Sequence, residues 1–188
     1  MSQANVGIVR KPLRACGQST RTLDQRLLLR FPRLTVAYLR LIDKLPPGSR
    51  LRQAAVWRGV RLGLEAYNRR DLDAAVIGWH PGFEYHPARD WVEAGLVEPC
   101  YRGLEGYRRY VVIADEISGG ELYLKPIELI DLGGRLLILA DAPIRAQASD
   151  APQTDPFAAV TTLKDGRVIH LQEYFDHAEA LEAVGLSE

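Results

Sequence analysis

The sequence predicts an α+β fold in which a curved antiparallel sheet wraps around helices. In the first 70 residues, apolar side chains recur at spacings of three and four, which is typical of amphipathic helices. The second half contains short strand-like runs, and Gly133-Gly134 and Lys164-Asp165-Gly166 separate them as hairpin turns do. Helices followed by consecutive hairpins indicate an α+β domain.

The N-terminal part is expected to be helical from about Thr22, after a polar, mobile tail at residues 1–18. Pro32 should kink or split this first helix. Ser49 should cap a second helix that runs to about Arg69, and Asp71 should start a short third one. The apolar stripe of the first helix consists of Leu27, Phe31, Leu34, Tyr38, Leu41 and Leu45.

The remaining elements follow from the change to a two-residue period. A long loop is expected at 87–101, and helices are expected at 103–114 and 177–185. The predicted strands are 83–86, 121–131, 135–147, 156–164 and 167–175.

Length and composition fit one globular domain plus an extension, because the chain has 188 residues, of which 47% are hydrophobic and 26% charged. No window approaches the ~18–20 uncharged apolar residues that a bilayer demands. No apolar stretch of secretory length opens the sequence, so we expect a cytoplasmic protein. Cys16 and Cys100 show no framework spacing and are expected to be reduced thiols.

Charge divides the chain into a basic N-terminal extension, residues 1–48, and an α+β domain, residues 49–188. Residues 1–50 hold ten Lys and Arg against two Asp and Glu, a net charge of +8, and the rest of the chain carries −8. We expect the extension to pack its apolar stripe on the acidic body or on a second subunit. Contact of residues 22–45 with a membrane surface is a weaker alternative. Nucleic-acid binding is not expected, because no aromatic platform accompanies the charge.

Cofactor and metal signatures are missing from the sequence. It contains no GxGxxG, no Walker sequence and no Gly-x-Ser-x-Gly elbow. His80, His86, His170 and His177 show no i,i+4 spacing and no cysteine partner, so the sequence predicts no metal and no cofactor.

Four segments carry a resemblance to a known family. They are residues 64–73 (LEAYNRRDLD), 80–85 (HPGFEY), 101–106 (YRGLEG) and 163–186, which includes EYFD and ALEAVGL. Together they resemble SnoaL-like proteins of the nuclear transport factor two-like superfamily, over about residues 52–186. The resemblance implies a cone whose bent sheet and helices enclose one deep apolar pocket, and often a homodimer. It also implies a range of activities, from polyketide cyclisation, steroid isomerisation and epoxide hydrolysis to plain ligand binding, so the fold does not fix the function.

Cofactor-free chemistry in such a pocket needs an acid or base whose pKa burial moves towards neutrality. Glu173 is the best candidate, because it shares a strand face with Leu171 and Phe175. Its alternative is a pair with an arginine or a place at the wet end of the strand. Asp141 is the second candidate, since it follows the apolar run 136–140, and its alternative is an exposed edge or a bend at Pro143.

Limonene epoxide hydrolase offers one comparison, in which Asp141 and Glu173 resemble the two catalytic carboxylates and Tyr85 the tyrosine of the site. Leu139 stands where that enzyme has the arginine that bridges the two acids, and the water-holding asparagine falls near Pro87. Arg145 substitutes for this arginine only if the strand geometry differs. These departures argue against epoxide hydrolysis.

Ketosteroid isomerase offers another comparison, in which the catalytic aspartate falls on His86, an imidazole that can act as a base at neutral pH. The two oxyanion donors of that enzyme fall near Gly63 and Ala159, so the enolate would lack support. Tyr85 and His86 are neighbours on a strand and point to opposite faces. We favour Tyr85 inward with Phe83, which makes His86 and Glu84 an outer polar pair.

Aromatic and basic side chains complete the predicted site. Trp79 and Trp91 are expected in the pocket wall, and Trp91 lies in the 87–101 loop, where it would cover the mouth of the cone. The leading hypothesis is a protein that binds a small, largely apolar organic molecule and performs cyclisation, isomerisation or hydration. Glu173 and Asp141 would transfer protons, Tyr85 would orient the ligand and Arg145 would hold its polar end. The alternative is a non-catalytic dimeric module with a filled pocket and an interacting arm.

Overall fold

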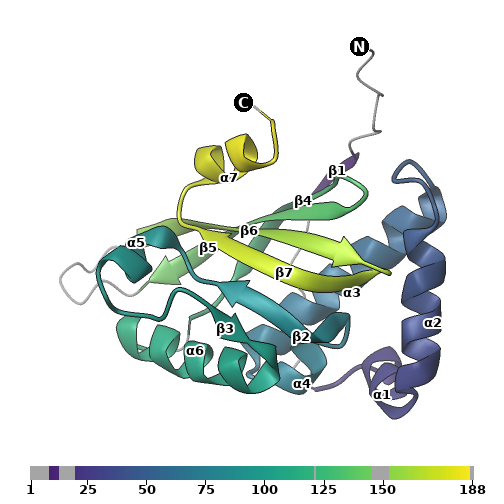
Figure 1. Ribbon diagram of the computed structural model, residues 1–188, viewed down its shortest axis with the longest axis horizontal. Helices are drawn as coiled ribbons and strands as arrows, with labels where there is room; N and C mark the ends of the chain where they lie inside the picture. Colours follow the sequence, from purple (N-terminus) through teal and green to yellow (C-terminus); the bar gives the residue numbers. More distant parts are fainter. Residues whose placement is uncertain (1–8, 13–19, 121, 145–152, 187–188) are drawn as a thin grey trace.

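One seven-stranded sheet organises the molecule, in the strand order β1-β4-β5-β6-β7-β2-β3 (Figure 1). The computed structural model describes residues 9–12, 20–120, 122–144 and 153–186. The strands are β1 (Val9–Pro12), β2 (Trp79–His86), β3 (Tyr101–Arg102), β4 (Lys125–Asp131), β5 (Arg135–Ile144), β6 (Gln153–Lys164) and β7 (Arg167–Tyr174). The helices are α1 (Leu23–Arg30), α2 (Pro32–Asp43), α3 (Arg50–Asn68), α4 (Leu72–Ala75), α5 (Arg89–Glu93), α6 (Gly103–Ile117) and α7 (His177–Ala183).

Helix starts follow the capping residues that the sequence offers. Thr22 caps α1 by accepting a hydrogen bond from the backbone N–H of Gln25, and Ser49 and Asp71 cap α3 and α4 with their side chains. Pro32 occupies the first turn of α2, where a backbone N–H would have no acceptor within the helix, so its absence costs no hydrogen bond. The predicted helices and the predicted split at Pro32 are therefore confirmed.

The sheet is mixed, which corrects the expectation of a purely antiparallel one. β4 to β7 form consecutive antiparallel pairs, and the turn between β6 and β7 places Asp165 and Gly166 in the left-handed region, with φ of 54° and 72°. β2, however, runs parallel to β7. These two strands lie about 90 residues apart in the chain, so no hairpin dictates their direction.

Three short elements were not expected. Residues 9–12 form β1, which pairs with β4, although the sequence predicts a mobile tail there. The predicted loop 87–101 contains the short helix α5, and at its end Tyr101–Arg102 form β3, which pairs with β2. These segments lack a clear hydrophobic period, so periodicity could not find them.

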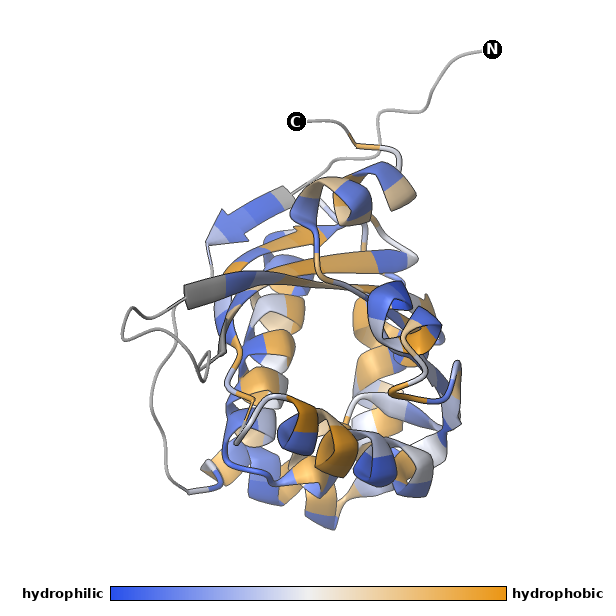
Figure 2. Ribbon diagram, turned by 90° about the vertical axis from the view of Figure 1, so that its left-hand side faces the viewer, coloured by the Kyte–Doolittle hydropathy of each residue, from blue (hydrophilic) through white to orange (hydrophobic). Residues whose placement is uncertain are grey.

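The sheet is covered on both faces in its middle (Figure 2). On one face lies the larger core, which joins β2 and the inner side chains of β4 to β7 to α3 and α6. On the other face, α7 packs Ala180, Leu181 and Val184 against a smaller cluster that contains Ile130, Leu137 and Leu139. Because β5 is buried from both sides, its run Leu136–Ala140 is apolar without alternation.

A buried ion pair joins the N-terminal helices to the sheet. The guanidinium group of Arg52, in α3, donates to both carboxylate oxygens of Asp131 in β4, at 2.8 and 3.1 Å. It also donates to the carbonyl oxygens of Asp43 and Gly133, at 3.1 and 2.6 Å. This network fixes the end of α2, the start of α3 and the β4–β5 turn relative to one another.

The apolar stripe of α1 and α2 is largely exposed, so of the two expected partners, the acidic body and a second subunit, the body of the same chain does not cover it. Leu27 is 58% and Leu34 67% accessible to solvent. The opposite side of the two helices makes the contacts, through Gln25, Thr35 and Ile42, which are buried. Within the described residues, no helix is both long enough and apolar enough to span a bilayer.

Candidate functional site

A cavity of about 220 Å³ lies between the sheet and the helices, with walls from α1, α2, α3, β2, β5, β6 and β7. Most lining side chains are aliphatic or aromatic, as in pockets that bind organic molecules. Its polar lining groups include Gln25, Thr35, Asp43, Arg52, Tyr67, Tyr85, Tyr107, Thr161 and Glu173. The cone is therefore hollow rather than filled by its own side chains.

Glu173 lies at the deep end of this cavity, only 2% exposed. It points to the concave side of β7 because it alternates with outward-facing residues and shares that face with Leu171. The hydroxyl of Tyr85 donates to one carboxyl oxygen, and the hydroxyl of Tyr110 donates to the other at 2.5 Å. The predicted inward position of Glu173 and Tyr85 agrees with this geometry.

Burial raises the pKa of the Glu173 carboxyl well above its usual range, and an interaction with the backbone of Ala88 acts in the opposite direction. Burial also raises the pKa of the hydroxyls of Tyr67, Tyr107 and Tyr110. The deep end thus favours neutral groups. The carboxyl of Glu173 and the hydroxyls of Tyr67, Tyr85 and Tyr107 are the polar groups that this part of the cavity offers to a ligand.

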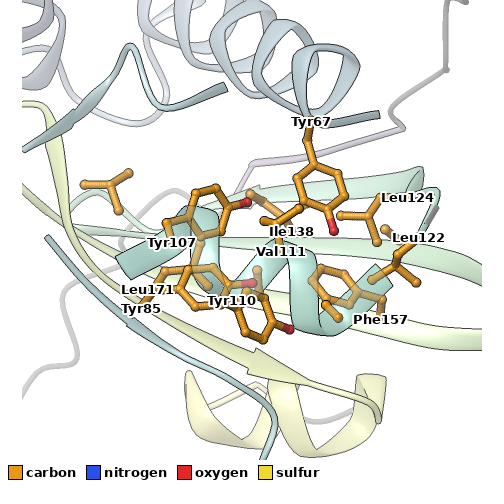
Figure 3. Close-up of a cluster of buried hydrophobic side chains, with 14 of the residues drawn as sticks. Tyr67, Tyr85, Tyr107, Tyr110, Val111, Leu122, Leu124, Ile138, Phe157 and Leu171 are labelled. Carbon is orange, nitrogen blue, oxygen red and sulfur yellow. The ribbon is translucent and has the colours of Figure 1, made fainter. Parts of the chain in front are cut away.

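Aromatic rings hold Tyr85 in place (Figure 3). The ring of Tyr85 lies 4.8 Å from Tyr107 and 4.7 Å from Tyr110, measured between centroids. Trp79 meets Phe83 edge to face at 4.6 Å and Tyr107 at 5.3 Å. These contacts leave Tyr85 little freedom to change rotamer, so its hydroxyl stays directed at Glu173.

The opposite end of the cavity lies against the N-terminal helices. Leu28, Tyr38 and Leu39 line it there, and Tyr38 is 45% exposed. The lining around Glu173, where Tyr85 and Tyr107 are also buried, is the closed end of the cavity, whereas Tyr38 belongs to a side that reaches solvent.

Two predicted catalytic residues lie elsewhere. Asp141, in β5, lies on the sheet face opposite to its neighbours Ala140 and Ala142, which belong to the larger core. It is therefore on the other side of the sheet from Glu173, and the structure does not bring the two acids together. His86 also points away from the cavity, beside Glu84, with its Nε2 3.6 Å from Glu84 Oε2. This is the outer polar pair that strand alternation predicts.

Some of the predicted aromatic site residues line the cavity and others lie outside it. Trp79 and Tyr85 line the cavity, whereas Phe83 is 1% exposed and packs behind Trp79. Trp91, in α5, packs against Phe175 at 4.9 Å and lies outside the lining. The prediction that Trp91 covers an entrance to the cavity therefore stays a prediction. Arg145 lies outside the described residues.

Sequence reasoning missed Tyr110, the second tyrosine that binds Glu173. The signal was present, since Tyr107, Tyr110, Val111 and Ala114 form the buried stripe of α6 at helical spacing. A tyrosine on such a stripe must bury its hydroxyl, and a buried hydroxyl needs a polar partner. Glu173 is that partner for Tyr110.

Comparisons with known proteins place the fold. No known protein-family profile and no curated protein matches the sequence. Among solved structures, TerC co-crystallised with polyporic acid is 21% identical, with a TM-score of 0.55, over 66% of this chain and 94% of TerC. An NTF2-like protein of unknown function from Burkholderia pseudomallei is 23% identical, with a TM-score of 0.53, over 68% of this chain and 95% of its own.

A SnoaL-like protein of unknown function from Burkholderia thailandensis gives a third match, with 21% identity and a TM-score of 0.51. It covers 66% of this chain and 97% of its own. Each of these neighbours therefore aligns over almost its whole length with about two thirds of this chain. The remaining third is additional to what they share with it.

Proposed function

Because the chain has the cone fold of SnoaL-like and NTF2-like proteins, we propose that it binds a small, largely apolar organic molecule and exchanges a proton with an oxygen atom of that molecule. The observation that carries the proposal is the buried Glu173 held by Tyr85 and Tyr110 at the closed end of an apolar cavity. TerC, which shares the fold, was crystallised with polyporic acid. An organic ligand therefore suits this fold.

The size of the cavity limits the ligand. An apolar protein cavity of about 150 Å³ binds benzene, so a space of about 220 Å³ suits one or two rings. A ligand of that size would contact aliphatic walls over most of its surface. One polar atom at the closed end would then fix its orientation.

The chemistry follows from the protonation state of Glu173. Burial raises the pKa of its carboxyl well above the usual range and so favours the protonated acid, which would act as a general acid towards a carbonyl or hydroxyl oxygen. Tyr85 also lines the cavity and can donate to the same oxygen once a ligand displaces its bond to Glu173. Tyr110 would hold the other carboxyl oxygen and act as a positioning residue.

Binding is tested with a matched pair of probes, 2-naphthol and naphthalene, which differ by one hydroxyl. We expect the protein to bind 2-naphthol about 5- to 10-fold more tightly, since one net hydrogen bond contributes roughly 1 kcal/mol. Tyr85→Phe and Glu173→Gln should reduce that preference, whereas Val112→Ser, an exposed change on α6, should leave it intact. Equal affinity for the two probes, or no binding of either, would contradict a polar contact at the closed end.

Proton exchange is tested with 2-tetralone, a bicyclic ketone, in D₂O. When Glu173 protonates the carbonyl oxygen, solvent water can take the proton from the neighbouring carbon, and the enol that forms picks up deuterium from D₂O when it returns to the ketone. Positioned acid–base groups commonly accelerate proton transfer by about 10²–10⁴-fold, so we expect the wild type to accelerate deuterium exchange beside the carbonyl. Glu173→Gln should lose most of that acceleration while it still binds the ketone. Binding without accelerated exchange would support the non-catalytic alternative and remove the acid–base step.

The exposed stripe of α1 and α2 supports a second candidate function, a homodimeric module. We propose that a second copy of this chain covers the exposed apolar side chains Leu23, Leu27, Phe31, Leu34 and Leu41. Charge favours a second copy, because exposed arginines 26, 30 and 33 flank the stripe while the rest of the chain carries a net charge of −8.

Analytical ultracentrifugation separates the possible partners. The wild type should sediment as a dimer and Leu27→Ser/Leu34→Ser as a monomer, while Val112→Ser, which alters an exposed valine outside the stripe, should stay dimeric. A wild-type monomer that co-sediments with anionic phosphatidylserine vesicles would overturn the dimer in favour of a membrane surface.

A further inference from the structure

The outer face of the β2–β3 edge gathers three side chains that bind metals. Phe83 and Tyr85 point into the core, so Glu84 and His86 point to the opposite face of β2. β3 pairs antiparallel with β2 and places Tyr101 opposite Tyr85. Cys100, one residue before, therefore lies across from His86.

The donor atoms of these three residues are already close together. One carboxylate oxygen of Glu84, one ring nitrogen of His86 and the Sγ of Cys100 lie within 4.8 Å of one another. Two ligand atoms at about 2.0–2.1 Å from one tetrahedral zinc ion are roughly 3.4 Å apart. The 3.6 Å between His86 Nε2 and Glu84 Oε2 needs only a small adjustment to match that geometry.

His86 supplies independent support. Its Nε2 is shielded from solvent and has no hydrogen-bond partner within the described part of the chain. Buried polar atoms in native proteins are nearly always satisfied, so an orphaned one calls for a partner. A metal ion between His86, Glu84 and Cys100 would satisfy this nitrogen without any change in the backbone.

The surroundings of the cluster hold Glu84 in place. The other oxygen of Glu84 forms an ion pair with Arg102 at 2.9 Å, which leaves Oε2 turned towards His86. Such outer contacts orient metal-binding carboxylates. His170, in β7, is in register with Glu84 and its ring centroid lies 4.6 Å from that of His86, so it is a neighbour of the cluster, but its nitrogens are not among the three clustered donors.

We propose that Glu84, His86 and Cys100 form a binding site for a divalent transition metal such as zinc on the outer face of the β2–β3 edge. Thiolate, imidazole and carboxylate are all zinc ligands, and a water molecule in the fourth position completes a tetrahedral shell. The sequence predicts no metal, because its histidines show neither i,i+4 spacing nor a nearby cysteine. The three ligands instead come from β2 and from the residue before β3, which only the folded sheet brings together.

The site is separate from the proposed ligand cavity, although both use β2. Tyr85 lies between Glu84 and His86 in the chain and points to Glu173 on the other face. A metal at this site would fix the strand that carries Tyr85. Its binding can nevertheless be measured without any organic ligand, so the two proposals stand or fall independently.

The experiment titrates metal-free, full-length protein with Co²⁺ and then with Zn²⁺. A Cys16→Ser background removes the other thiol of the chain. We expect one equivalent of Co²⁺ to bind with a thiolate-to-metal charge-transfer band, which Cys100→Ser abolishes. His86→Ala and Glu84→Gln should each weaken Zn²⁺ binding at least tenfold, while His80→Gln, on the same strand but exposed, should leave it unchanged.

Circular dichroism of each variant shows that it is folded, and the rise in melting temperature with added Zn²⁺ gives a second readout, because a ligand that binds only the native state stabilises it. Wild type that binds neither ion at micromolar concentration would overturn the proposal. So would binding whose affinity and spectrum are the same in folded Cys100→Ser and His86→Ala. A loss of the charge-transfer band in Cys100→Ser alone, with His86→Ala unaffected, would also overturn the ligand set.

Discussion

Two carboxyl groups are buried in the same sheet, but their partners differ in kind. Asp131, at the end of β4, is 4% exposed and forms an ion pair with the guanidinium of Arg52. Glu173, in β7, is 2% exposed and binds two tyrosine hydroxyls. A neighbouring cation favours an ionised carboxylate, whereas burial away from any cation favours the neutral acid.

The difference distinguishes a carboxylate with a structural role from one that is placed to contact a ligand. Asp131 also accepts the backbone N–H of Gly133 at 2.9 Å, so all its contacts join chain segments to one another. Glu173 instead lines the cavity, where burial raises the pKa of its carboxyl and a ligand can reach it. Burial alone therefore does not identify a functional acid, and the nature of its partner does.

The largest effect is expected from Arg52→Met, which leaves Asp131 buried without its cation. Removal of one partner of a buried ion pair commonly destabilises a protein by about 3–5 kcal/mol. Urea denaturation should show a loss of that size. The double variant Arg52→Met/Asp131→Asn removes the uncompensated charge and should recover part of the stability. A loss below about 1 kcal/mol in the single variant would mean that the pair contributes little.

The pH dependence of stability should distinguish Glu173 from the other acids. Burial raises the pKa of Glu173 in the folded protein, whereas in the unfolded chain it stays near the usual value for glutamate, about 4.3. At a pH between these two values, the folded protein holds a proton that the unfolded chain has lost. The contribution of Glu173 is therefore full below about pH 4.3 and is lost as the pH rises. The loss is about 1.4 kcal/mol per pH unit.

Glu173→Gln removes this titration, so the stability of the variant relative to wild type should increase from pH 5 to pH 7. Chemical denaturation at several pH values measures the difference, and contributions from acids common to both proteins cancel. Glu105→Gln, a change at an exposed site on α6, serves as the control and should follow the wild-type profile. A parallel pH profile for Glu173→Gln would show that its carboxyl titrates normally.

Much of the fold could be predicted because local chemistry dictates it. Thr22, Ser49 and Asp71 begin helices, and Gly133 and Gly166 have positive φ in the turns that join the central strands. The parallel pairing of β2 with β7 could not be predicted, since no local turn connects them. The N-terminal helices were found, but their amphipathic pattern does not say which partner covers the stripe.

The site was predicted where strand alternation is visible and missed where it is not. Glu173 and Tyr85 lie in strands that alternate between core and outer faces, so their inward direction can be read from the sequence. Asp141 follows Leu136–Ala140, which is buried on both faces and carries no alternation. Its side could not be assigned from such a run, and the assumption that it faces Glu173 failed.

The smallest effect is expected from Asp141→Asn. Its partly exposed side chain lies on the outer face, opposite Lys125 on the neighbouring strand, and exposed pairs of opposite charge contribute only about 0–1 kcal/mol. We expect the free energy of unfolding to change by less than about 0.5 kcal/mol. The affinity for 2-naphthol should change by less than about twofold, which corresponds to about 0.4 kcal/mol. Titration of the probe into wild type, Asp141→Asn and Glu173→Gln makes the comparison directly. If Asp141→Asn lost as much affinity as Glu173→Gln, both acids would contact the ligand, and Asp141 could not lie on the opposite face of the sheet from the cavity.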